Sequence, residues 1–139
     1  MEKAEIQALI REAFAAQKFA YVPYSHFHVG AALRGKNGQV FRGCNIENAS
    51  YTPTNCAERT ALFKAVSEGV REFDAIAIVG SKVWETNTLV TGPCGVCRQA
   101  LYEFGGPELT VIMARSEDDY IVTTLGDLLP YGFGPANLE

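Results

Sequence analysis

The sequence predicts a single α/β domain, a three-layer α/β/α sandwich around a mixed five-stranded sheet. Three observations support this fold class. Helix and strand patterns follow one another in the order helix, strand, strand, helix, strand, helix, strand, strand. Residues 75–79 form a continuous apolar run, as expected for a strand covered on both faces. No linker, internal repeat or low-complexity segment divides the 139 residues, so we expect one domain over residues 1–139.

The first half of the chain predicts a helix and then a hairpin. A helix over about residues 3–20 is indicated by an apolar stripe at helical spacing, made of Ile6, Leu9, Ile10, Ala13, Phe14 and Ala20. Strands at 29–33 and 40–42 flank Asn37-Gly38, a dipeptide typical of hairpin turns. Small residues at 30–32 indicate that a helix packs closely on the first of these strands.

Two further helices carry clear start and stop signals. The first follows Thr54 or Asn55 as N-cap and ends at Gly69. The second enters at Pro93 and ends at Gly105 and its glycine neighbour. Both helices therefore begin at short cysteine-containing motifs.

The remaining strands place those motifs at one edge of the sheet. Besides residues 75–79, we expect strands at 109–113 and 120–123, the latter at an edge, and a polar loop over residues 81–92. Strand-helix-strand units bring helix N-termini to the carboxyl ends of strands, where such sheets bind ligands. The two cysteine motifs are expected at those positions.

Composition excludes several functional classes. The formal net charge of −4 argues against a protein that coats nucleic acid or an anionic membrane surface. No apolar run approaches the roughly 18 residues needed to span a membrane. The first residues indicate a charged helix rather than a signal peptide, so we expect a cytoplasmic protein whose thiols stay reduced and can bind metal.

Three thiols are expected to meet: Cys56 from the first motif, and Cys94 and Cys97 from the second. Three ligands are one short of a closed tetrahedral zinc site, and catalytic zinc keeps one position for water. Glu58, two residues from Cys56, is the natural acid/base for that water. Arg59 is placed to donate to a thiolate sulfur, and two helix N-termini add further positive charge.

Other interpretations of these residues stay open at this stage. A structural zinc site could recruit His26 or His28 as fourth ligand, giving a binding module without chemistry. Cys44 is best interpreted as a small buried hydrophobic residue. Arg98 could help to neutralise the sulfurs or could lie on a solvated helix face.

Cys56-Ala57-Glu58 followed by Pro93-Cys94-x-x-Cys97 resembles the signature of the zinc-dependent cytidine deaminase superfamily. More narrowly, the chain resembles the small homotetrameric cytidine deaminases that act on free nucleosides. The similarity covers five stretches in order, residues 23–33, 43–51, 56–61, 93–99 and 128–130. It implies a cytidine deaminase-like fold for nearly the whole chain.

The resemblance implies a reaction and the residues that perform it. Cys56, Cys94 and Cys97 would hold one Zn²⁺ per chain. Zinc-bound hydroxide would attack C4 of cytidine or 2′-deoxycytidine, with Glu58 passing the proton to N3 and then to the departing amine. The products would be ammonia and uridine or 2′-deoxyuridine, a step of pyrimidine salvage.

The resemblance also implies how the nucleoside is bound. The free backbone N–H of Ala57 would hold the base O2, and Phe27 would pack on the nucleoside. Asn45 and Glu47 would bind ribose hydroxyls. Taken alone, these residues would be interpreted as core and turn residues.

Phe133, and Tyr51 on weaker grounds, would reach the site of a neighbouring subunit in a homotetramer. Residues 131–135 are rich in Gly and Pro, which leaves the register of Phe133 open. Around residues 84–87 we expect a loop that is longer than the one this family often has.

The same resemblance separates competing substrates. Deaminases that edit RNA or single-stranded DNA usually have His in place of Cys56 and a basic groove with stacking aromatics, and neither is visible. Nucleotide substrates would need a basic phosphate cradle. Deaminases of cytosine-nucleoside antibiotics share both cysteine motifs, but Asn45-Ile46-Glu47-Asn48 favours ordinary nucleosides.

Overall fold

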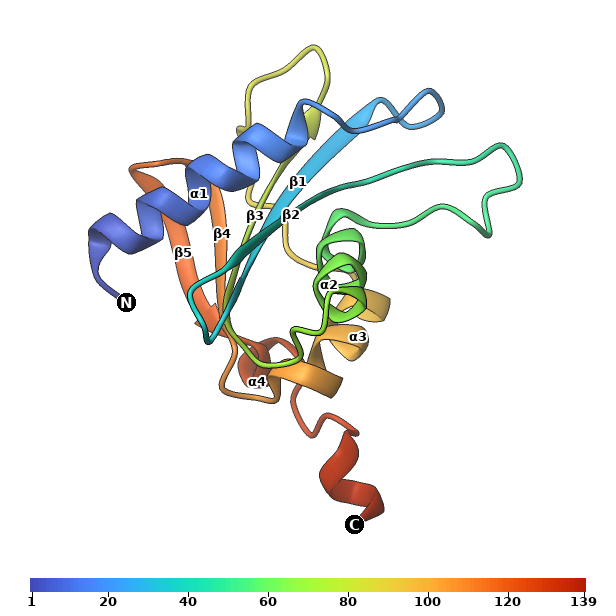
Figure 1. The fold of residues 1–139 in the computed structure, drawn as a ribbon. Helices are drawn as coiled ribbons and strands as arrows, with labels where there is room; N and C mark the ends of the chain where they lie inside the picture. The colour runs from blue at the N-terminus through green and yellow to red at the C-terminus, as the bar shows by residue number, and fades with distance from the viewer.

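The computed structural model describes residues 1–139 as three layers (Figure 1). A five-stranded sheet has α1 on one face and α2 and α3 on the other. The elements are α1 (Lys3–Gln17), β1 (Phe27–Gly35), β2 (Val40–Cys44), α2 (Ala57–Ser67), β3 (Phe73–Lys82), α3 (Gly95–Gly105), β4 (Thr110–Ser116), β5 (Asp119–Thr124), α4 (Leu125–Leu128) and a final 3₁₀ turn (Pro135–Leu138). None of the helices combines the length and apolar character that crossing a membrane requires.

The strand order is β2-β1-β3-β4-β5, which confirms the predicted mixed sheet. The β1–β2, β1–β3 and β4–β5 pairs are antiparallel, whereas β3 and β4 are parallel. A parallel pair needs a crossover, and α3 supplies it. Because α3 follows β3, its N-terminus lies near the carboxyl end of that strand.

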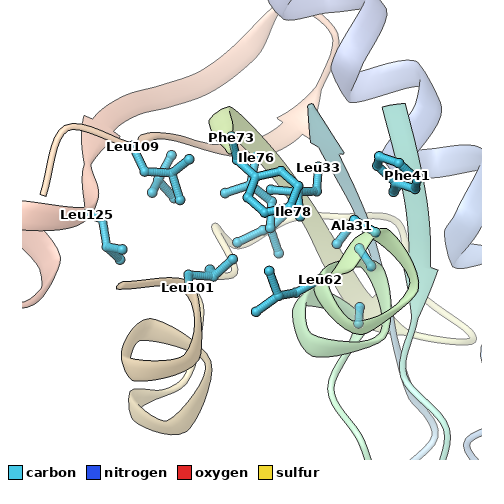
Figure 2. Close-up of a cluster of buried hydrophobic side chains, with 14 of the residues drawn as sticks. Ala31, Leu33, Phe41, Leu62, Phe73, Ile76, Ile78, Leu101, Leu109 and Leu125 are labelled. Atoms are coloured by element: carbon cyan, nitrogen blue, oxygen red, sulfur yellow. The ribbon is translucent and has the colours of Figure 1, made fainter. Parts of the chain in front are cut away.

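Two hydrophobic cores lie on opposite faces of the sheet. The larger one packs the sheet against α2 and α3 (Figure 2), and it includes Leu33, Leu62, Ile76 and Leu101. The smaller one packs the sheet against α1. Successive residues of a strand point to opposite faces, so β3 supplies apolar side chains to both cores. This explains why its apolar run is continuous.

Glycines let both helical layers approach the backbone of the sheet. A Cβ added to Gly30 would lie 2.0 Å from the Ala13 carbonyl oxygen of α1. A Cβ added to Gly43 would lie 2.3 Å from the Ala57 carbonyl oxygen of α2. The predicted close helix packing at Gly30 is therefore confirmed, and Gly43 sets the distance between β2 and α2.

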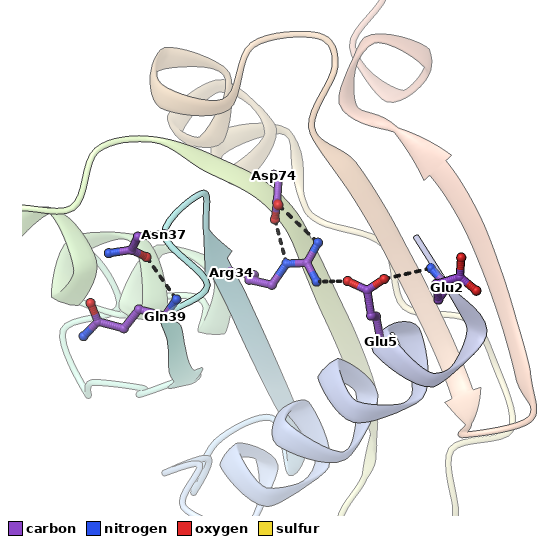
Figure 3. A network of polar contacts seen from close by, with 6 residues as sticks. All are labelled: Glu2, Glu5, Arg34, Asn37, Gln39 and Asp74. Atoms are coloured by element: carbon purple, nitrogen blue, oxygen red, sulfur yellow. Dashed lines mark hydrogen bonds and ion pairs between the residues drawn. The ribbon is translucent and has the colours of Figure 1, made fainter.

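The N-terminal end of α1 is tied to the sheet by Arg34 (Figure 3). The guanidinium donates to both carboxylate oxygens of Asp74, at 2.8 and 3.1 Å, and to Glu5 at 2.9 Å. Glu5 in turn accepts from the Glu2 N–H at 3.1 Å. Bidentate arginine–carboxylate pairs are geometrically specific, so this contact fixes α1, β1 and β3 relative to one another.

Two predicted helix ends were wrong. The first helix ends at Gln17 rather than at Ala20, since Phe19 and Ala20 donate to carbonyls only three residues back. The N-cap of α2 is Cys56, not Thr54 or Asn55. Asn55 instead exchanges two backbone hydrogen bonds with Ile46, at 2.9 and 3.0 Å, which holds it in extended conformation.

The strands are longer than the apolar runs that predicted them. β3 continues to Lys82 and so includes the first two residues of the predicted 81–92 loop. β1 begins at Phe27, and β5 lies at the sheet edge as expected. Polar residues at the strand ends form backbone hydrogen bonds with the neighbouring strand, but their side chains add nothing to the apolar pattern. The apolar pattern therefore stops before the strand does.

Candidate active site

Three thiols converge where α2 and α3 begin. Cys56 is the N-cap of α2, Cys94 is the N-cap of α3, and Cys97 lies in the first turn of α3. Both caps are extended and accept the first helical hydrogen bond, from Thr60 and Arg98. The three sulfur atoms all lie within 4.8 Å of one another, with Cys56 and Cys94 3.7 Å apart.

The cluster fits a zinc ion that keeps an open position. Zn–S bonds of about 2.3 Å in a tetrahedron place sulfurs about 3.8 Å apart, close to the Cys56–Cys94 separation. No His, Asp or Glu joins the group. His28 contacts the Ser81 hydroxyl at 3.2 Å, and the His26 ring packs 5.7 Å from Trp84. The structure thus gives neither histidine the place of a fourth ligand.

The surroundings of Cys56 favour its thiolate. The neighbouring Cys97 thiol has the largest influence, and together with Arg59 and Cys94 it outweighs burial and lowers the pKa of Cys56 to about 5. Arg59 Nη2 lies 3.3 Å from the Cys56 sulfur, as its sequence position predicted. The thiolate is the form that binds metal, so Cys56 is prepared to act as a ligand.

Glu58 is a carboxyl group buried beside this cluster, only 4% exposed. Its burial, reinforced by the neighbouring Cys56 charge, raises the pKa of Glu58 to about 7. A general acid/base is most effective when its pKa lies near the working pH. Ala57, immediately before it, is fully buried at the first position of α2, where its backbone N–H has no helical acceptor.

The ribose pair predicted from the sequence has structural partners of its own. The Asn45 amide accepts from the Val29 N–H at 2.9 Å and donates to the Phe27 carbonyl at 2.8 Å. The amide therefore fixes the start of β1 and retains one N–H for another partner. The sequence gives no sign that the Asn45 side chain forms hydrogen bonds with the backbone of β1.

Glu47 is held in place by the segment that precedes β1. One carboxylate oxygen accepts from the Tyr24 and Ser25 N–H groups at 3.0 and 3.1 Å, and the other from the Ser25 hydroxyl. Burial raises the pKa of Glu47, but the hydrogen bonds from Ser25 and Tyr24 outweigh it and lower the pKa overall. Glu47 is thus ionised at neutral pH and able to accept hydroxyl hydrogen bonds.

A groove of about 420 Å³ runs beside Glu47 and is also lined by Tyr24, Ser25, Tyr51 and Thr54. The Tyr51 ring meets the Tyr24 ring edge to face at 6.1 Å and is 71% exposed. The sequence interpretation gave Tyr24, Ser25 and Thr54 no part in substrate binding. The sequence signal was present, since Tyr24 and Ser25 lie in the first matching stretch.

The two predicted phenylalanines lie apart from this groove. Phe27 is half-buried at the start of β1 and lines a separate pocket of about 270 Å³ with Gly80, Ser81, Glu85 and residues 88–91. Phe133 is 57% exposed, and its carbonyl accepts from Gln99 at 2.8 Å. Their contact with substrate stays a prediction.

One subsidiary interpretation was wrong, and another, that Cys44 is a buried residue outside the metal site, was right except for the extent of burial. Arg98 neither contacts a sulfur nor lies free on the surface, because it donates to the Pro93 carbonyl at 2.8 Å and the Leu128 carbonyl at 2.7 Å. Cys44 is half-buried rather than buried and lines a different pocket, with Arg42 and Lys64. Burial raises the pKa of Cys44, so it remains a thiol apart from the other three.

Comparison with known proteins assigns the chain to a family. The model of the cytidine and deoxycytidylate deaminase zinc-binding region matches residues 3–113. A cytidine deaminase from Sporosarcina psychrophila is 47% identical over 135 residues, covering 97% of this chain and 96% of the relative. A blasticidin-S deaminase from Bacillus cereus is 34% identical over 106 residues, covering 74% of each chain.

Solved structures agree with this assignment. The crystal structure of cytidine deaminase from Burkholderia pseudomallei is 52% identical with a TM-score of 0.82, covering 91% of this chain and 97% of that chain. The cytidine deaminase from Mycobacterium tuberculosis is 42% identical with a TM-score of 0.78, covering 91% and 95%. The sheet and the helices around it thus have the fold of a known enzyme family. The chain belongs to the cytidine and deoxycytidylate deaminase zinc-binding family.

Proposed function

We propose that the protein is a zinc-dependent cytidine deaminase that converts free cytidine and 2′-deoxycytidine to the corresponding uridines and ammonia. One observation carries the proposal: three thiols from two helix starts converge beside the buried carboxyl group of Glu58. A purely structural zinc site would close with a fourth ligand and would not need an acid next to it. Family membership supports the same conclusion.

Cys56, Cys94 and Cys97 would hold one zinc ion per chain. A zinc ion in such a site supplies a Lewis acid that lowers the pKa of a coordinated water to about 7. The N-termini of α2 and α3 and the Arg59 guanidinium oppose the negative charge of three thiolates. They would therefore help a zinc ion with three sulfur ligands to remain a strong enough Lewis acid to lower the pKa of its water.

Glu58 performs the proton transfers. It accepts a proton from the attacking water, delivers it to N3 of the cytosine ring and so makes C4 more electrophilic. It then carries the second water proton to the amino group. The C4–N4 bond breaks, and one water and one cytidine become one uridine and one ammonia. A pKa raised to about 7 by burial suits a group that must both accept and release protons.

The remaining residues bind the nucleoside. The Ala57 N–H holds the base O2, and the Asn45 amide and the Glu47 carboxylate bind ribose hydroxyls. Phe27 packs on the nucleoside. The groove beside Glu47 is lined by tyrosines, hydroxyls and a carboxylate, without an Arg or Lys, which supports an uncharged nucleoside over a nucleotide.

We also propose that residues 1–139 act as one domain within a homotetramer. Large apolar side chains are widely exposed, among them Phe19, Trp84, Leu89 and Phe133. Contact with neighbouring chains would remove this apolar surface from water, which favours assembly. Phe133 and Tyr51 are both exposed, and in the proposed tetramer they would complete the sites of neighbouring subunits.

The decisive experiment mixes purified protein with cytidine, follows the ultraviolet change to uridine, and measures zinc in the same sample. Parallel reactions contain 2′-deoxycytidine, deoxycytidine monophosphate and blasticidin S. We expect conversion of the two free nucleosides with one zinc per chain. A zinc-loaded sample that leaves cytidine unchanged would remove the proposal, and conversion of blasticidin S in its place would reassign the substrate.

A further inference from the structure

The helix that carries two of the cysteines also carries a docking surface for the end of the chain. Residues 128–134 lead from α4 to the final turn, which projects from the body in Figure 1. Arg98, Gln99 and Tyr102 of α3 contact this segment. All three lie within five residues of Cys97.

Hydrogen bonds hold the segment at two points. Arg98 Nη1 donates to the Leu128 carbonyl at 2.7 Å, while its Nε donates to the Pro93 carbonyl at 2.8 Å. Gln99 Nε2 donates to the Phe133 carbonyl at 2.8 Å. One arginine therefore connects the start of α3 to the end of α4, and the next residue fixes the phenylalanine backbone.

Tyr102 sets the register of the segment. A Cβ at Gly132 would lie 2.7 Å from Tyr102 Cε2, and a Cβ at Gly134 would lie 2.6 Å from Cε1. Only glycine therefore allows the backbone to contact the ring at both positions. Gly134 is buried although the residues beside it are exposed. Phe133, between these two glycines, is 57% exposed, so much of its side chain is left open to solvent.

We infer that Gln99 and Tyr102 are positioning residues that hold residues 132–134 against α3 and thereby present Phe133 in a fixed direction. This inference rests on the proposed function, in which Phe133 contacts the nucleoside of a neighbouring site. A segment that is ordered beforehand loses less conformational entropy when substrate binds. Releasing it should weaken substrate binding and leave the chemical step unchanged.

The main test replaces Gln99, which is exposed, so that folding is preserved. Gln99→Ala should raise KM for cytidine roughly tenfold with kcat within about twofold. The matched control is Glu103→Gln, an exposed position on the same helix without a side-chain hydrogen bond, which should change neither constant. In a Phe133→Ala background, Gln99→Ala should have no further effect on KM.

A second pair of variants tests the contact between ring and glycine. Gly134→Ala should raise KM in the wild-type background and have little effect in a Tyr102→Ala background, where the overlapping ring is absent. Hydrogen–deuterium exchange of residues 129–134, measured without substrate, should increase in Gln99→Ala and in Gly134→Ala. Zinc content should stay at the wild-type value in both.

Three outcomes would overturn the inference. Unchanged exchange in both variants would show that these contacts do not hold the segment. Faster exchange with unchanged KM would make the docking structural only. An undiminished Gln99→Ala effect in the Phe133→Ala background would remove Phe133 from the explanation. Failure of the proposed function is distinguishable, because wild-type protein would then not convert cytidine whatever the exchange result.

Discussion

The cysteine cluster and the rim, the loops where we propose that the nucleoside binds, are built in opposite ways. The cluster is formed by residues at the starts of two regular helices, and its acid, Glu58, is 4% exposed. The rim is formed by loops, with Tyr51 71% exposed and Phe133 57% exposed. The non-glycine residues with positive φ, His26, Tyr51 and Tyr131, all lie in these rim segments.

The difference follows from how each region is held. Helix starts fix backbone N–H groups and side chains through the core beneath them, because α2 and α3 pack on the sheet. The loops before β1 and before α2 extend beyond the sheet in Figure 1 and are joined by isolated bridges such as Tyr21 to Ile46. The three thiols thus come together on the packed helix starts, whereas the rim segments are held mainly by hydrogen bonds between loops.

Glu58→Gln should produce the largest effect, because it removes the proton carrier from an otherwise intact centre. We expect kcat to fall by about 10⁴-fold or more, since one carboxyl group serves two proton transfers. Zinc content should remain at one per chain, because Glu58 is not in the ligand cluster. The measurement is steady-state deamination with metal analysis. Near-normal turnover would assign the proton transfers to another group.

Zinc removal should have the next largest effect, on stability as well as on activity. A metal bound a thousandfold above its Kd adds about 4 kcal/mol, which corresponds to a Tm decrease of roughly 10 °C on chelation for a chain of this size. Calorimetry with and without a strong chelator measures it. Cys44→Ala is the matched control and should show the wild-type shift, because Cys44 lies outside the cluster. A smaller shift in that variant would make Cys44 a ligand.

Arg59→Gln should weaken the metal centre without destroying it. The substitution removes a cationic donor 3.3 Å from the Cys56 sulfur and leaves a shorter, uncharged polar side chain. Loss of such a supporting contact costs about 10- to 100-fold in metal affinity or activity. Competition with a chromophoric chelator gives the affinity. Unchanged affinity and turnover would reduce Arg59 to a packing residue.

Phe133→Ala should have the smallest effect, because the rim supplies binding rather than chemistry. We expect KM to rise about tenfold or somewhat more with zinc and kcat retained. Mixed tetramers test the cross-subunit role. Chains with Glu58→Gln keep the phenylalanine, and chains with Phe133→Ala keep the acid, so hybrids should bind cytidine better than Phe133→Ala alone. If the mixed sample shows only the summed activities of the two separate variants, Phe133 contributes to the site of its own subunit.

The sequence predicted the sheet and the metal cluster well because both depend on strong local patterns. The apolar run at residues 75–79 is visible without tertiary information, and the sequence signals place both helix starts within two residues of the N-caps Cys56 and Cys94. Cys-x-x-Cys at a helix start brings two thiols to one side by helical spacing alone. The third thiol required only that the second helix begin at the same edge of the sheet.

The rim could not be predicted in the same way because its contacts are long-range and use backbone groups. Asn45 reaches β1, and Arg98 reaches the carbonyl of Leu128, thirty residues ahead, with no charge partner to indicate it. Likewise, nothing local indicates that Glu47 is held by Ser25. Backbone carbonyls and N–H groups occur at every residue, so such pairings leave no mark in the sequence.

The close contact at Gly43 has a consequence for mutational tolerance. Carbon and oxygen normally approach to about 3.3 Å, and a methyl group at position 43 would lie 2.3 Å from the Ala57 carbonyl. Alanine there would shift the start of α2 by on the order of 1 Å, whereas metal–ligand bonds tolerate about 0.2 Å. A saturation-mutagenesis survey should therefore score this position among the least replaceable, although it touches neither ion nor nucleoside. We therefore expect other members of the family to keep glycine at this position, because its side chain is only a hydrogen atom.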